Sequence, residues 1–524
     1  MPTEQALRAL VLAALAGLPG VARAEGPLSA IDWLSESVTA PGATSGNGST
    51  TLPPPPDEPA VTTESVLPED IAVSVIGGPS PDAVGLLSPK VTGFPQDLWG
   101  LGKLDEVTTA IRGASAEGMP ALQSLLITLL IAEAAPPADA GGDATLLLAR
   151  VDKLLEMGAL DQAAALLRAA GTVENAAVFR RAFDVALLTG TEDSACEDLA
   201  RAPELAPTLP VRVFCLARSG DWNAAALTLR TAQALGHVTG VEDELLSRFL
   251  DPELYEGEPI PNPPKPVTPL IWRIYEAIGE PLPTTTLPLA FAHAELGPRA
   301  GWKAQLEAAE RLTRAGVLPA NQLLGLYTQR RPAASGGVWD RADAFQRFDT
   351  ALLAGDVDTV EQRLPLAWAR MADVEAEVPF SELYAVQLSH LPLTGDAARI
   401  AWEMGFLSTS YRRLADSELS PGDVRAAFLA GIASGSVAGL AAPDSMARAI
   451  APAFTNPVLP EAARVLIEQK RVGEAILLAV SLVASGLHGD EAQVAQGLAV
   501  LRELGLEDAA RRTALELMIL ERRG

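Results

Sequence analysis

The sequence predicts an all-α protein built from successive helical hairpins. A recurring junction, in which an apolar helix ends at Gly and Ala follows five positions later, occurs at Gly158, Gly190 and Gly220, and in looser form at Gly505. Gly takes the left-handed backbone that ends a helix, Asp caps the next helix, and Ala lets the two helices approach closely. The composition agrees: 48% of residues are hydrophobic but only 5% are aromatic, which suits helices better than a large β-structure.

The first residues predict export. A single Arg8 precedes an apolar run at 9–18, and Ala22-Arg23-Ala24 supplies a cleavage pattern of small residues. We therefore expect a signal peptide over 1–24, cleaved after Ala24, and a periplasmic mature protein. An ordinary amphipathic first helix is the alternative.

A short amphipathic helix is predicted over residues 25–39. Leu28, Ile31, Leu34 and Val38 share one helical stripe, and Trp33 lies beside it. Such a helix either docks on a partner or folds back on its own domain. Ile31, Trp33 and Leu34 are therefore candidate partner-binding residues.

The next two segments predict little regular structure. Residues 40–68 are rich in Pro, Gly, Ser and Thr, which indicates a disordered linker. Residues 69–103 predict one short extended strand at 71–75, where Ile and Val alternate with smaller residues, followed by an irregular apolar segment.

Helical hairpins follow in two lobes. The N-terminal helical-repeat lobe spans 104–250 and the C-terminal one 270–524, with a Pro-rich connection at 251–269. The first three Gly junctions lie about 30 residues apart, a spacing typical of tetratricopeptide-like repeats. No segment of the mature chain has the roughly 20 apolar residues that a transmembrane helix needs, and 122–132 is best explained as a buried helix.

Cys196 and Cys215 are the only cysteines. The repeat pattern predicts helices on either side of a Pro-rich turn, and the midpoint of the two cysteines falls in that turn. Residues equidistant from the turn of an antiparallel hairpin lie at the same height, so we expect a structural disulfide. It would stabilise the fold by roughly 3 kcal/mol. A redox-active pair lacks the usual Cys-x-x-Cys spacing, and two buried thiols are the alternative if the chain is not exported.

Composition and motifs argue against several functions. The formal net charge is −26, and −27 without residues 1–24, which disfavours nucleic acid or an anionic membrane as the main partner. The four histidines are far apart, and no nucleophile elbow or phosphate-binding loop is present. We therefore expect neither an enzyme nor a bound metal or cofactor. Trp222, at an interhelical turn, is a further candidate partner-binding residue.

Two stretches, 145–236 and 465–521, resemble tetratricopeptide-like α-solenoids of the bacterial envelope, although they lack the full repeat signature. The whole chain is also similar to a group of alphaproteobacterial exported helical-repeat proteins, through Ile31-Asp-Trp-Leu, Val84-Gly-Leu-Leu and Gly93-Phe-Pro-Gln-Asp-Leu-Trp99. Some of these carry the label antifreeze glycopeptide polyprotein. That label implies Ala-Ala-Thr arrays, which this sequence does not contain, so antifreeze activity receives no weight.

These observations favour a non-enzymatic periplasmic scaffold or adaptor that binds envelope proteins through a helical-repeat surface. An alternative is a non-catalytic accessory of cell-wall enzymes, since some lytic transglycosylases carry a helical superhelix beside their catalytic domain. A cleft with a Glu of raised pKa would make a glycosidase a candidate again. A periplasmic chaperone for a motility or secretion component is the third hypothesis.

Overall fold

The computed structural model describes residues 80–115, 117–171, 175–415 and 423–520. Within these ranges the chain is all-helical, with twenty-five α-helices (α3–α27) and no strand, which confirms the all-α prediction for this part of the protein. One isolated parallel bridge joins Leu87 to Ala132. The predicted signal peptide, amphipathic helix, linker and strand lie outside the described residues.

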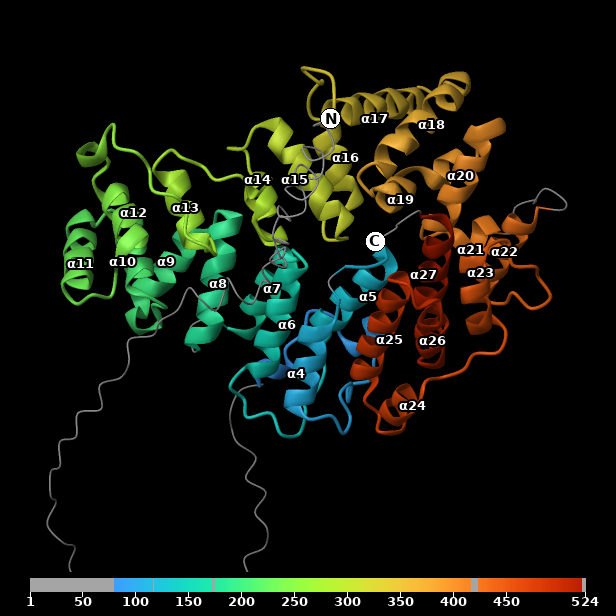
Figure 1. Ribbon diagram of the computed structural model, residues 1–524, viewed down its shortest axis with the longest axis horizontal. Coiled ribbons are helices and arrows are strands. Elements are labelled where there is room, and N and C mark those ends of the chain that lie inside the picture. The colour runs from blue at the N-terminus through green and yellow to red at the C-terminus, as the bar shows by residue number, and fades with distance from the viewer. Residues whose placement is uncertain (1–79, 116, 172–174, 416–422, 521–524) are drawn as a thin grey trace, which may run out of the picture.

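The first part of the main body consists of four long helices that pack side by side (Figure 1). The central one packs against the other three, because its apolar residues surround it on most sides. Two short elements, η1 (Pro81–Ala83) and α3 (Pro89–Thr92), precede them. The four helices are α4 (Leu104–Gly113), α5 (Pro120–Ile131), the central α6 (Thr145–Glu156) and α7 (Leu160–Ala170).

The chain then forms a smaller unit, residues 176–282, here termed the lobe (green in Figure 1). Each helix packs on the next, and the last one returns to pack on the first. The lobe has its own apolar core around Phe183, Phe214 and Tyr275. Its elements are α8 (Ala176–Thr189), α9 (Glu192–Arg201), η2 (Pro203–Leu205), α10 (Leu209–Arg218), α11 (Trp222–Ala234), α12 (Gly240–Leu250), η3 (Pro252–Tyr255) and α13 (Pro269–Ala277).

The rest of the chain returns to the main body and shares one large core with α4–α7. Its longer helices form antiparallel neighbours, such as α17 with α18 and α25 with α26. Shorter pieces connect them: η4 (Thr284–Thr286), η5 (Leu289–Phe291), α14 (Ala292–Glu295), α21 (Tyr411–Ala415), α23 (Ser445–Ile450) and η6 (Ala451–Phe454). The longer helices are α15 (Trp302–Arg314), α16 (Ala320–Thr328), α17 (Val338–Leu353), α18 (Val357–Ala372), α19 (Glu377–Leu388), α20 (Gly395–Leu407), α22 (Val424–Ser434), α24 (Glu461–Glu468), α25 (Val472–Leu487), α26 (Glu491–Glu503) and α27 (Glu507–Ile519).

The two ends of the described chain meet in the main body. Helix α27 packs on α5, and α25 packs on α4 and α5. The Leu101 amide donates a hydrogen bond to the carbonyl of Gln469 (3.2 Å), and the Gly473 amide donates to that of Leu98 (2.9 Å). Glu516 accepts a hydrogen bond from the Ala121 amide at 2.9 Å. The main body is therefore closed by contacts between its first and last helices rather than left as an open row.

The Gly junctions have the predicted backbone. Gly158, Gly190, Gly220 and Gly505 have φ values of 77°, 76°, 87° and 77°, in the left-handed region. At three of the four junctions the Ala five residues later is fully buried between helices; these are Ala163, Ala225 and Ala510. Close approach of paired helices through Ala is thus confirmed there.

The predicted Asp caps are correct at only one of the first three junctions. Each following helix begins two residues after the Gly, so the residue directly after Gly is the N-cap. Asp221 occupies that place and accepts a hydrogen bond from the Ala224 amide at 3.0 Å. Asp161 and Asp193 lie inside the first turn, where the caps are Ala159 and Thr191, so neither aspartate caps its helix.

None of the helices in the described ranges is long and apolar enough to span a membrane. The apolar stretch around 122–132 forms most of α5, whose Leu122, Leu126 and Leu129 are buried in the main core. This agrees with the prediction of a buried helix.

Candidate functional site

The lobe is braced by the predicted disulfide. Cys196 on α9 and Cys215 on α10 are joined, with their Cα atoms 5.1 Å apart and a sequence separation of 19. The two helices have the ranges that the repeat pattern predicts on either side of the Pro-rich turn. The bond therefore ties the two helices together at one height, next to the aromatic core that supports the candidate site.

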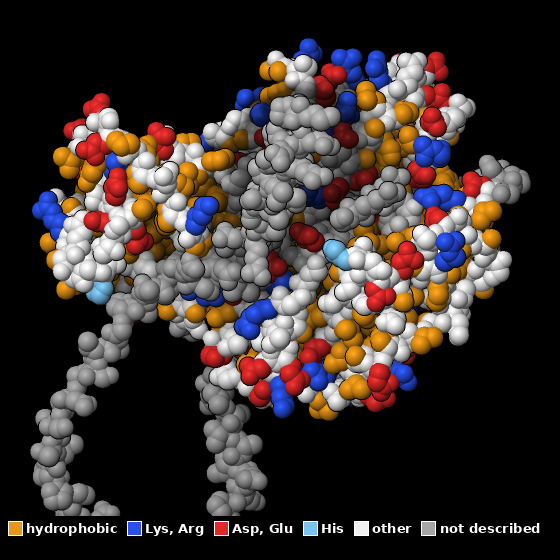
Figure 2. Space-filling model, viewed as in Figure 1, with side chains coloured by type: hydrophobic (Ala, Val, Ile, Leu, Met, Phe, Trp, Pro, Cys, Tyr) orange, Lys and Arg blue, Asp and Glu red, His pale blue; other side chains and the backbone are white. Residues whose placement is uncertain are grey.

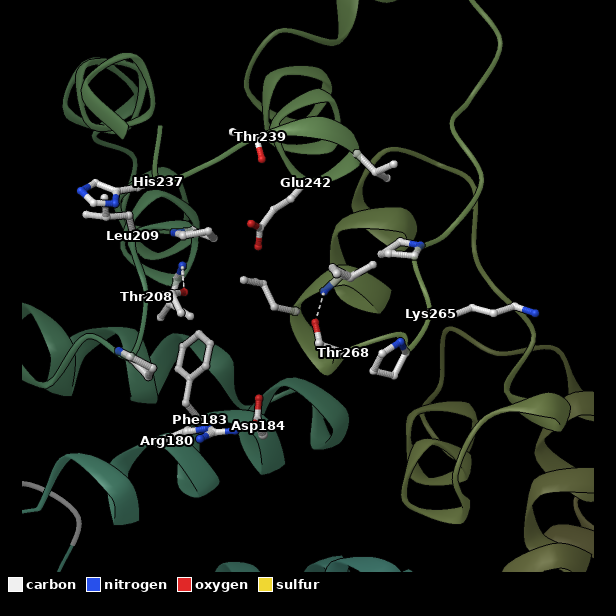
Figure 3. Close-up of a pocket in the computed structure, with 18 of the residues that line it drawn as sticks. Arg180, Phe183, Asp184, Thr208, Leu209, His237, Thr239, Glu242, Lys265 and Thr268 are labelled. Atoms are coloured by element: carbon white, nitrogen blue, oxygen red, sulfur yellow. Dashed lines mark hydrogen bonds between the residues drawn. The ribbon is translucent and has the colours of Figure 1, made fainter. Parts of the chain in front are cut away.

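A cavity of about 640 Å³ opens into the lobe (Figure 3). Its floor comes from the middle of α8, and its sides from the starts of α10, α12 and α13 and the segment that precedes α13. Ten of the nineteen lining residues are apolar: Phe183, Leu209, Val211, Val241, Leu270, Ile271 and four prolines.

 

The lining thus combines these apolar residues with five ionisable side chains. The prolines are Pro207, Pro210, Pro264 and Pro266. The ionisable lining residues are Arg180, Asp184, His237, Glu242 and Lys265. The cavity thus has apolar walls interrupted by ionisable side chains and threonines.

Asp184 is the most unusual of these side chains. It lies in the middle of α8 and is only 6% exposed. Its Oδ2 atom has no hydrogen-bond partner among the described residues, and Figure 3 shows the carboxylate directed toward the cavity. Burial raises the pKa of Asp184 to about 7, although the nearby charges of Arg180 and Arg181 lower it. Asp184 therefore keeps its proton to a much higher pH than an exposed aspartate does.

Glu242 enters the cavity from the first turn of α12 (Figure 3). Burial raises the pKa of this carboxyl above its ordinary value, and no nearby cation opposes the shift. On the floor, the pKa of Arg180 is lowered, first by burial and then by the charge of Arg181. Two carboxyl groups in an apolar setting are therefore the main polar features of the interior.

The other polar residues mostly serve the backbone or lie at the edge. The Thr208 hydroxyl accepts a hydrogen bond from the Val211 amide (3.3 Å), and the Thr268 hydroxyl accepts one from the Ile271 amide (3.2 Å). These two contacts start α10 and α13 and so fix two walls of the cavity. His237 is exposed, and Lys265 is exposed and extends away from the interior in Figure 3.

Trp222 does not belong to this cavity. It is the first residue of α11, is 51% exposed, and its ring centroid lies 6.2 Å from that of Phe249. Gly236, which lines the cavity, follows the other end of α11, about 20 Å away along a helix of thirteen residues. The other candidate contact residues, Ile31, Trp33 and Leu34, lie outside the described residues.

Sequence reasoning did not identify Asp184 or Glu242. One signal was available for Asp184, because it interrupts the apolar run from Phe183 to Leu188 within a predicted helix. A carboxylate in such a run is rarely buried without a function or a partner. Glu242 gives no comparable signal, since it begins an ordinary acidic turn, Glu242-Asp-Glu244.

A second groove, of about 740 Å³, lies along α17 and α18. Its charged side chains are more exposed, and Arg347 is paired with Asp343 at 2.7 Å. Within the described residues, no group of three or more His, Cys, Asp or Glu side chains is placed to hold a metal ion. The cavity of the lobe is therefore the stronger candidate site.

Comparisons with protein-family models, with curated proteins and with solved structures found no match to this chain. The function is therefore inferred from the chain's own residues.

Proposed function

We propose that the protein is a non-enzymatic scaffold or adaptor of the periplasm, which binds an envelope protein through a tetratricopeptide-like helical-repeat surface. The observation that carries the proposal is the cavity of the lobe. Apolar walls with polar groups that converge on one cavity are typical of a binding site, and the mouth lies between the ends of several helices, where an extended polypeptide segment can enter.

Two further features support this function. The disulfide between Cys196 and Cys215 suits an oxidising compartment such as the periplasm. Large apolar side chains are also exposed on the same lobe: five of the fifteen in the described residues lie between positions 222 and 260. Figure 2 shows apolar side chains at the surface over this part of the lobe. Trp222 is the most suitable of them for a second contact with the partner.

The test is in-cell crosslinking of the tagged full-length protein in its native host, with mass spectrometry of the captured proteins. Thr239→Trp fills the mouth of the cavity from an exposed position, and Leu353→Trp adds the same side chain on the exposed end of α17. We expect one envelope protein to be captured by the wild type and by Leu353→Trp but not by Thr239→Trp. Equal capture by both variants, or capture of cytoplasmic proteins alone, would contradict the proposal.

The same cavity favours a second candidate function, in the processing of cell-wall glycans. A Glu of raised pKa in a cleft is the usual acid of a glycosidase, and both Glu242 and Asp184 have raised pKa values. Release of soluble sugar from purified peptidoglycan by the wild type, but not by Glu242→Gln, would establish this activity. The scaffold proposal predicts no release by either protein.

A further inference from the structure

Two carboxyl groups face the cavity, and neither forms an ion pair among the described residues, although Arg180 and Arg181 lie near enough to Asp184 to lower its pKa. The Oδ2 atom of Asp184 has no hydrogen-bond partner among the described residues, and burial is the only influence that shifts the pKa of Glu242. Burial of an unpaired carboxylate costs free energy, and a bound cation would remove much of that cost. The unpaired Oδ2 atom lies on a side chain that is 94% buried, so it is held in place by the fold rather than free to turn to solvent.

The basic residues of the lining do not supply the cation that would compensate the two buried carboxyl groups. Lys265 extends away from the interior (Figure 3), and the attraction of Arg180 is not sufficient to offset the burial of Asp184, whose pKa stays raised. The lobe as a whole is acidic: residues 176–282 contain nine Lys and Arg and sixteen Asp and Glu, a net charge of −7. This charge attracts a cationic ligand and repels an anionic one.

The apolar walls define the rest of the ligand. Phe183 lies on the floor beside Asp184, and Leu209, Val211 and Ile271 form neighbouring walls. A small hydrated metal ion would gain nothing from these side chains. An ammonium group on an apolar stem would place its charge near the carboxylates and its methylene groups against the walls.

We propose that the cavity binds an alkylammonium group, with Asp184 as its anionic partner, Glu242 as a second negative charge in the same cavity and the apolar walls as the site of its stem. This inference rests on the proposed binding function, in which the group is the side chain of a Lys in an extended segment of the partner. A free alkylamine has the same chemistry and is distinguished from the Lys side chain by the test.

The first arm of the test uses small probes and the full chain. Binding of n-pentylammonium, n-pentanol and pentanoate is measured by ligand-observed NMR. We expect n-pentylammonium to bind at least tenfold more tightly than the other two. Asp184→Asn should weaken its binding at least tenfold, and Glu242→Gln should weaken it by a smaller factor. Glu253→Gln, at an exposed position of the same lobe, is the control and leaves binding unchanged. Equal binding of all three probes would overturn the inference.

The second arm uses an extended Ala-rich peptide with one central Lys, and the same peptide with norleucine in its place. Tighter binding of the Lys peptide supports both proposals. Equal binding of both peptides supports the binding function and overturns the alkylammonium inference. Binding of n-pentylammonium without either peptide identifies a free amine as the ligand and overturns the polypeptide function. Binding of no probe at all overturns both.

Discussion

Replacing Asp184 by Asn removes a buried charge without changing the size of the side chain. Because burial raises the pKa of Asp184 from 3.8 to about 7, ionising it in the folded protein costs free energy that the unfolded chain does not pay. The unfolded state loses its proton near pH 3.8 and the folded state near pH 7. The wild type therefore loses stability as the pH rises through this window, and the full cost is present above pH 7.

The magnitude follows from the shift. At about 1.36 kcal/mol per pKa unit, the cost is roughly 4 kcal/mol at pH 8 and roughly 1.7 kcal/mol at pH 5. Asp184→Asn should therefore stabilise the protein by about 2.5 kcal/mol more at pH 8 than at pH 5. Urea unfolding followed by circular dichroism at the two pH values measures this difference, and Asp97→Asn, at an exposed aspartate, is the control. An equal effect of Asp184→Asn at both pH values would refute the assignment of a buried, unpaired carboxylate.

Three further predictions concern other contacts. Replacing Cys196 and Cys215 together by Ser should lower the free energy of unfolding by about 3 kcal/mol, and dithiothreitol should then destabilise only the wild type in urea unfolding. Arg341→Met removes the cation that lies 2.6 Å from the buried Glu310 and leaves that carboxylate with only the hydrogen bond from the Tyr327 hydroxyl, so it should cost about 3 kcal/mol in the same assay. A Cβ on Gly100 would lie 2.4 Å from the carbonyl oxygen of residue 470, so Gly100→Ala should loosen this contact and speed amide hydrogen exchange at 98–102 and 469–473. A Cβ on Gly118 would have no neighbour within 4 Å, so Gly118→Ala should leave this exchange unchanged.

The sequence was sufficient for the local structure of the hairpins. The Gly junctions, the helices on either side of the Cys196–Cys215 turn and the buried helix at 120–131 depend on interactions between residues close in the chain. Such interactions leave a pattern in the sequence. The N-cap residues could not be predicted as well, because the cap depends on the exact residue at which a helix begins. A shift of two residues decides whether Ala159 or Asp161 is the N-cap of α7.

Contacts between distant segments left no such pattern. Nothing in 251–269 indicates that the chain turns back so that α13 packs on α8, and this return creates one wall of the cavity. The closure of the main body by residues 98–101 and 469–473 is equally long in range. The candidate site therefore could not be located from the sequence, because its walls come from segments far apart in the chain. The apolar neighbours of Asp184 in the sequence indicated only that this carboxyl group is buried.

The most direct test of the central claim is site-specific photo-crosslinking in the native host from position 237, at the edge of the cavity, with position 353 on α17 as the control. The crosslinked residue of the captured protein is then identified by mass spectrometry. The account predicts that position 237 alone captures one envelope protein, through an extended segment that contains a Lys. The same captured proteins at both positions would contradict it.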